Sequence, residues 1–122
     1  MIDARQFISL QLRGGLVITQ LEFTHEPLVD ALDREAIAQT RIVGRECLLL
    51  IHAGLSEEEL SVTLYHEILE AASVASSSPP AAVMEFNEAA FERAALAAHG
   101  RWGSASPANL NLLLQFHGFR EH

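Results

Sequence analysis

The sequence has a single cysteine and no long apolar run. One thiol cannot close a disulfide within the chain, which excludes a disulfide-stapled scaffold. Cys47 stands in the apolar run CLLLI, a setting typical of a small buried side chain rather than a reactive one. No apolar run approaches the roughly 20 residues that span a bilayer. The N-terminal MIDARQFISLQLRGG lacks the continuous apolar segment of a signal peptide, so we expect a cytoplasmic protein.

Basic residues are also scarce. Eight of them stand against 16 acids, which gives a net charge of -8. Such a surface disfavours nucleic acid and anionic membranes as partners and attracts cations. A phosphate-binding glycine loop is missing too, because RGGL lacks the flanking pattern. With 122 residues, 49% of them apolar, the chain is expected to form a single domain over residues 1–122.

The first half of the chain carries strand-like patterns. Apolar and polar residues alternate through FISLQLRGGLVITQLEFT, and Gly14–Gly15 in the middle predicts a hairpin turn. The stretch from Pro27 to Asp33 could form a short helix. Two strand-like runs then flank Gly44, and the second, Glu46 to His52, is apolar enough for a buried strand. We therefore expect a small, mostly antiparallel sheet of three or four strands.

The second half changes to helical periodicity. Ser56 and Glu59 form the capping-box pattern S-x-x-E, and acids crowd the first turn, where the helix dipole favours them. SSSPP must end that helix, and Ser106 followed by Pro107 is a typical start for another. The predicted helices run to about Ala75, from the prolines to Gly100, and from Pro107 to near Gly118. Strands followed by three helices indicate an α+β fold.

The first predicted helix contains TLYHEILEAA, which is nearly the metallopeptidase signature H-E-x-x-H. Residues four apart on a helix lie one turn apart and about 40° round, so His66 and Glu70 can hold one ion between them. Glu67, about 100° round from His66, can point at a water on that ion. Zinc accepts a carboxylate oxygen as well as an imidazole nitrogen, and the added carboxylate also suits harder ions such as manganese.

Two ligands are too few for a metal site, and the next predicted helix offers more. In EFNEAAFERAALAAHG, four residues recur at spacings of three, four and seven and are expected to share one stripe: Glu85, Glu88, Glu92 and His99. Consecutive helices joined by a short link pack against each other, so this stripe and the His66 stripe could face each other. The alternative is an ordinary solvated acidic face on each helix.

HEILE after an apolar strand, followed by NEAAFE on the next helix, resembles the zincin metallopeptidases. It is most similar to the gluzincin branch and to small bacterial and phage proteins, over roughly residues 45–100. The resemblance implies a minimal zincin-like domain that binds one divalent metal, zinc first of all, through His66, Glu70 and Glu88. Glu67 would be the general base. Glu92 or His99 could be the third ligand in place of Glu88, or could hydrogen-bond to a ligand and hold it in place. Glu70 replaces the usual histidine.

The resemblance implies metal-assisted hydrolysis of an amide bond in a peptide or an exposed protein loop. Two other readings stay open. The chain could bind a metal without hydrolysis, or the zincin fold could serve as a protein-interaction module. In the latter case the small apolar face of AAFERAALAA suits a close helix contact, including one between two copies of the chain.

Overall fold

The computed structural model describes residues 2–29 and 35–120. In this part of the chain, one sheet has the strand order β1-β2-β6-β5, and a second pairs β3 with β4. The strands are β1 (Leu10–Gln11), β2 (Val17–Thr24), β3 (Leu28–Val29), β4 (Glu35–Ala36), β5 (Ala38–Val43) and β6 (Glu46–His52). The helices are α1 (Glu57–Ala75), α2 (Glu88–Trp102) and α3 (Pro107–Phe116), with short 3-10 turns at Ala4–Gln6, Arg13–Gly15 and Ala81–Val83. The predicted α+β class is confirmed.

The larger sheet is mostly antiparallel. β1 pairs antiparallel with β2, and β5 pairs antiparallel with β6. The central pair, β2 with β6, is parallel and carries an irregularity between Ile18 and Gln20. The predicted hairpin at Gly14–Gly15 is present, since β1 and β2 pair antiparallel on either side of these glycines, whose φ values are positive, at 80° and 83°. Its first arm is only two residues long.

Between β2 and β5 the structure departs from the prediction. The expected helix from Pro27 to Asp33 is wrong at its start, because Leu28–Val29 is a strand paired with Glu35–Ala36. The remainder of that predicted helix, residues 30–33, lies outside the described residues. The runs on either side of Gly44 are confirmed as β5 and β6. Cys47, Leu49 and Ile51 on β6 are buried, as expected for a central strand.

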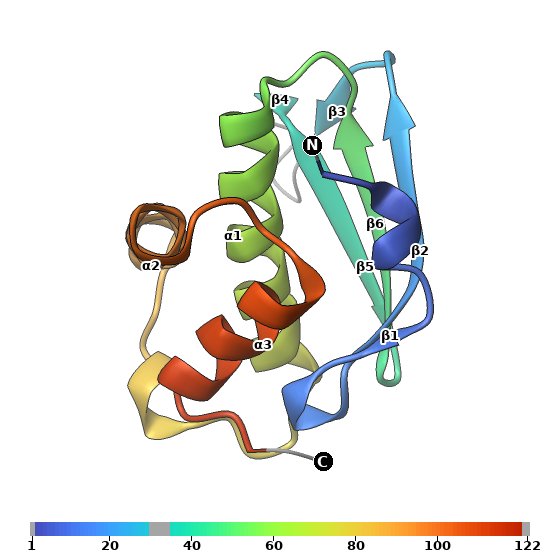
Figure 1. The fold of residues 1–122 in the computed structure, drawn as a ribbon. Coiled ribbons are helices and arrows are strands. Elements are labelled where there is room, and N and C mark those ends of the chain that lie inside the picture. Colours follow the sequence, from blue (N-terminus) through green and yellow to red (C-terminus); the bar gives the residue numbers. More distant parts are fainter. Residues whose placement is uncertain (1, 30–34, 121–122) are drawn as a thin grey trace.

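Helix α1 begins as predicted. The Ser56 side chain accepts from the Glu59 N–H while the Glu59 carboxylate accepts from the Ser56 N–H, so the capping box is complete. The helix ends at Ala75, before the serines and prolines. Figure 1 shows α1 against one face of the sheet, with α2 crossing it on the side away from the strands and α3 beside its lower half.

Helix α2 is shifted from its predicted position. It was expected to follow the prolines, but a 3-10 turn follows them, and α2 begins at Glu88 because the Asn87 side chain caps it by accepting from the Ala90 N–H. It passes the predicted stop at Gly100 and ends at Trp102, before Gly103, whose φ of 82° breaks the helix. Glu85 therefore lies outside α2 and is not part of its acidic stripe.

Side chains from both halves of the chain form a single apolar core between the sheet and the helices. Tyr65, Ile68 and Leu69 of α1 are completely buried against Leu49 and its neighbours, which fixes the rotation of α1 about its axis. α3 adds Leu110, Leu113 and Leu114. Within residues 2–29 and 35–120, no helix has both the length and the apolar character needed to cross a bilayer.

Candidate metal centre

Helix α1 positions three of the predicted site residues beside the core. Because Tyr65, Ile68 and Leu69 are turned inward and fully buried, His66 and Glu70 emerge at the margin of the core, where each is partly covered. Glu67 is also partly covered and points toward β5. The i, i+4 spacing therefore has the predicted effect. His66 and Glu70 lie on one side of α1, between the sheet and α2.

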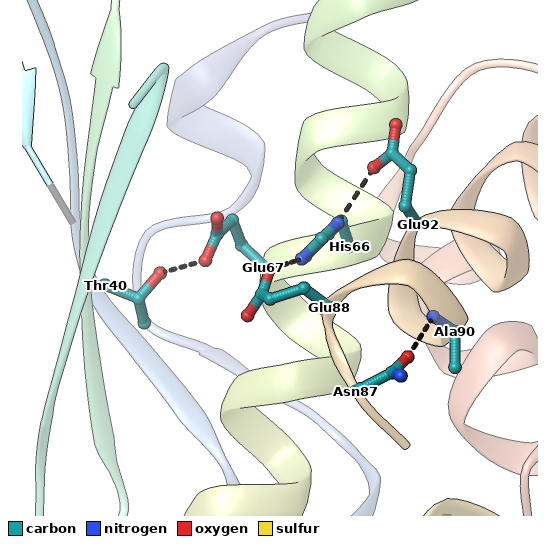
Figure 2. Close-up of polar contacts among 7 residues, drawn as sticks. All are labelled: Thr40, His66, Glu67, Asn87, Glu88, Ala90 and Glu92. Carbon is teal, nitrogen blue, oxygen red and sulfur yellow. Dashed lines mark hydrogen bonds and ion pairs between the residues drawn. The ribbon is translucent and has the colours of Figure 1, made fainter. Parts of the chain in front are cut away.

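The first turns of α2 bring carboxylates to His66. Its Nε2 lies 3.1 Å from Glu88 Oε2, and its Nδ1 lies 2.9 Å from Glu92 Oε1. Figure 2 shows the imidazole between these two side chains. The His66 side chain is only 13% exposed, whereas Glu88 is 70% exposed and Glu92 50% exposed. The two acidic stripes predicted from the sequence thus meet through one partly buried ring.

His66, Glu70 and Glu88 form a group that could hold a metal ion. Each offers one nitrogen or oxygen, and these three atoms lie within 4.8 Å of one another. Donors around a tetrahedral zinc, about 2.0–2.1 Å from the ion, are about 3.4 Å apart. Small side-chain rotations would close the difference, and an imidazole with two carboxylates is a donor set that zinc accepts. The geometry is therefore compatible with the predicted ligands, while the metal itself remains a prediction.

The electrostatics of this group favour a cation. Burial raises the pKa of Glu70 to about 8, helped by a hydrogen bond to Glu88 and by the charges of Glu88 and Glu67. The raised pKa of Glu70 favours its protonated form near neutral pH. Burial acts to lower the pKa of His66, but the hydrogen bond to Glu92 and the surrounding carboxylates outweigh it, so that pKa is raised. A divalent cation could replace these protons, since metal ligands must be deprotonated.

Glu67 sits on the sheet side of the same group. Its Oε2 accepts a hydrogen bond of 2.7 Å from the Thr40 hydroxyl of β5 (Figure 2). Burial raises the pKa of Glu67, although the hydrogen bond from Thr40 and the charge of His66 act in the opposite direction. A carboxylate with a raised pKa is better matched to proton transfer near neutral pH than an exposed one.

These residues line a cleft of about 1010 Å³. Its walls come from α1, the first turns of α2, β2, β5 and β6, and from the β3–β4 pair. The members relevant to the site are Thr40, His66, Glu67, Glu70, Glu88 and Glu92. Open space therefore adjoins both the possible ligands and the predicted base, as a substrate site would require.

The two rival ligands occupy different places. Glu92 contacts Nδ1 of His66, on the other edge of the ring from Glu88, and is not in the three-residue group. His99 lies near the end of α2, where its Nδ1 forms a hydrogen bond of 2.8 Å with Ser61. Of these two rivals, the structure brings only Glu92 to the cluster.

Sequence reasoning did not single out Thr40 or Ser61. Thr40 is a polar residue at a core-facing position of β5, opposite the buried Leu49, and this pattern could have drawn attention to it. Ser61 is completely buried within α1, where a lone serine offers no such signal. Tyr65, next to His66 in the sequence, is fully buried and its hydroxyl donates to the Gly103 carbonyl.

Comparison of the chain with protein-family models, with curated proteins and with solved structures gives no match. The resemblance to gluzincins accordingly remains a prediction that depends on the residues from His66 to Glu92.

Proposed function

We propose that the protein is a zincin-like metal-dependent hydrolase that cleaves an amide bond in a peptide or an exposed protein loop. The observation that carries the proposal is the grouping of His66, Glu70 and Glu88 at one point of the cleft, with Glu67 beside it. In this account His66, Glu70 and Glu88 hold one divalent ion, zinc as first choice. When bound, the ion would supply Lewis acidity toward the scissile carbonyl and toward water.

Glu67 carries the proton chemistry of this proposal. It would take a proton from the attacking water and later pass it to the departing amine. Its partial burial and its raised pKa support that role, because a carboxylate that binds protons too weakly is a poor general base at neutral pH. The open cleft along β5 gives an extended peptide access to the same carboxylate.

Glu92 would orient His66 rather than bind the ion. A metal-binding histidine usually donates its other ring N–H to a carboxylate, which fixes the tautomer and the ring plane. The Nδ1 contact with Glu92 supplies such a partner and leaves Nε2 on the side of Glu88 and Glu70. Glu92, which the sequence offered as a candidate third ligand, thus fits the role of the residue that orients His66.

The proposal is tested by the substitution Glu67→Gln on zinc-loaded protein. Turnover of a fluorogenic peptide library or unfolded casein should fall at least about 100-fold, because amide and carboxylate have the same shape but only the carboxylate accepts the proton. Zinc content should stay at the wild-type level. Undiminished turnover would contradict the role of Glu67. Bound zinc without turnover in the wild type would indicate a metal-binding protein that is not a hydrolase.

A protein-interaction module is the second candidate. The observation in its favour is the set of large apolar side chains that the helices leave exposed, among them Leu96 of α2 and Leu112 and Phe116 of α3, which are 52%, 40% and 60% exposed. Exposed apolar groups of this kind can mark a contact surface for a protein partner or a second copy of the chain. Light scattering after size-exclusion chromatography would detect self-association. Self-association that persists in metal-free protein would favour this candidate.

A further inference from the structure

The contact between Thr40 and Glu67 joins two elements that are far apart in sequence. Thr40 lies on β5, at the edge of the described four-stranded sheet, and Glu67 lies in the middle of α1. The 2.7 Å separation of Thr40 Oγ1 and Glu67 Oε2 is that of a strong hydrogen bond from a hydroxyl to a carboxylate. Figure 2 shows this hydrogen bond between the sheet and the polar cluster on α1.

A free glutamate side chain on a helix samples several rotamers, and most of them would carry the carboxylate away from the ligands. The Thr40 hydroxyl occupies one carboxylate oxygen, Oε2, and leaves Oε1 for a second partner. Thr40 is β-branched, so its own χ1 is restricted, and pairing with Leu49 of β6 fixes its backbone. The Thr40 hydroxyl, whose side chain has few rotamers, therefore donates to the Glu67 carboxylate, whose side chain has several rotamers available.

We propose that Thr40 is the positioning residue of Glu67: it holds Oε2 toward β5, so that Oε1 is the oxygen presented to the cleft. The catalytic meaning of this inference rests on the proposed function. The side-chain positioning itself does not. If the bond only fastened α1 to β5, its removal would lower stability without changing how Glu67 is oriented.

The test compares wild type with Thr40→Val, which removes the hydroxyl and keeps the branched shape, and with Thr40→Ser, which keeps a hydroxyl. Thr19→Val is the matched control, because Thr19 lies on β2, on the far side of β6 from β5, and donates to the Cys47 carbonyl instead. Three-bond couplings of the Glu67 Cγ, measured by NMR on metal-free protein, report the χ1 rotamer. Zinc content and, for zinc-loaded protein, kcat and KM are measured on the same four proteins.

We expect one Glu67 rotamer in wild type, Thr40→Ser and Thr19→Val, and averaged couplings in Thr40→Val. In Thr40→Val, kcat should fall at least about tenfold while KM and zinc content stay unchanged, because a misplaced catalytic group slows the reaction without weakening binding. Wild-type couplings in Thr40→Val, or averaged couplings in the wild type, would overturn the positioning role. A wild type that takes up no zinc would overturn the proposed function, and with it the catalytic meaning of Thr40, whatever the couplings show.

Discussion

His66 directs its two ring nitrogens at different carboxylates of α2. Nδ1 meets Glu92 and Nε2 meets Glu88, at 2.9 Å and 3.1 Å. Of these two acids, only Glu88 lies close enough to Glu70 and His66 for the three side chains to bind one ion. In the proposed function the two acids therefore have different tasks, with Glu88 as a ligand and Glu92 as the group that would orient the ring.

The substitution Glu92→Gln tests this division at the residue scale. Zinc affinity should fall about 10- to 100-fold, the usual cost of losing the partner of a ligating histidine, while the stoichiometry at saturating zinc stays at one. Glu85→Gln is the control, because Glu85 is an exposed acid outside α2 that does not line the cleft. Competition with a chromophoric chelator gives both affinities. An unchanged zinc affinity in Glu92→Gln would contradict the proposed role of Glu92 in orienting His66.

At the scale of elements, the crossing of α1 and α2 is held by a buried polar contact some distance along the helices from the cluster. Ser61 of α1 is fully buried, its hydroxyl accepts from the Ala105 N–H at 2.8 Å, and it is hydrogen-bonded to His99 Nδ1. One side chain thus ties α1 to the end of α2 and to the loop before α3. The position of Glu88 against His66 depends on that crossing.

Replacing Ser61 by alanine should lower the free energy of unfolding by about 1–3 kcal/mol, because the Ala105 N–H loses its partner in a buried position. Ser73→Ala is the matched control. The Ser73 hydroxyl donates to the Leu69 carbonyl within α1 itself, so its loss should change stability by no more than about 0.5 kcal/mol. Urea unfolding measures both variants. Equal effects would show that Ser61 does not hold the helix crossing.

Elements with local signals were predictable from the sequence, and those that depend on distant partners were not. The capping box at Ser56 and the proline after Ser106 act within one turn, so the starts of α1 and α3 were correct. Leu28–Val29 is a strand only because Glu35–Ala36 lies beside it. The start of α2 was misplaced because a 3-10 turn follows the prolines, and the helix begins only after the cap at Asn87.

At the scale of the whole molecule, the candidate site lies where the helical layer meets the sheet (Figures 1 and 2). The sequence could place His66 and Glu70 together, because their spacing is a property of one helix. It could not choose among Glu88, Glu92 and His99, because that choice depends on how α2 crosses α1. The contact of Thr40 with Glu67 could not be predicted for the same reason, since the approach of β5 to α1 is a tertiary contact.

Burial of the acidic cluster predicts how stability depends on pH. The pKa of Glu70 is raised from 4.5 to about 8, so the folded chain holds a proton that the unfolded chain has released. The raised pKa values of Glu67 and His66 act in the same direction. The free energy of unfolding of metal-free protein should therefore fall as pH rises from about 4.5 to about 8, with this contribution levelling off above that range.

Thermal unfolding across this pH range, with chelator or with zinc, tests the prediction. Zinc should raise Tm more at pH 8 than at pH 5.5, because the ligands must lose their protons to bind it. Glu70→Gln should flatten the pH dependence of the metal-free protein, since the amide does not titrate. A metal-free stability that rises between pH 5 and pH 8 would show that the cluster is not buried as described.

The central claim is that His66, Glu70 and Glu88 bind one divalent ion, and metal content tests it most directly. Protein purified without a histidine tag, and then supplied with zinc or manganese and desalted, is analysed by plasma mass spectrometry beside Glu70→Ala, Glu88→Ala and the exposed control Glu85→Ala. The account predicts about one ion per chain in the wild type and in Glu85→Ala, and loss of the ion in the other two. A wild type that retains no metal would contradict it and would identify the cluster as an acidic helix surface.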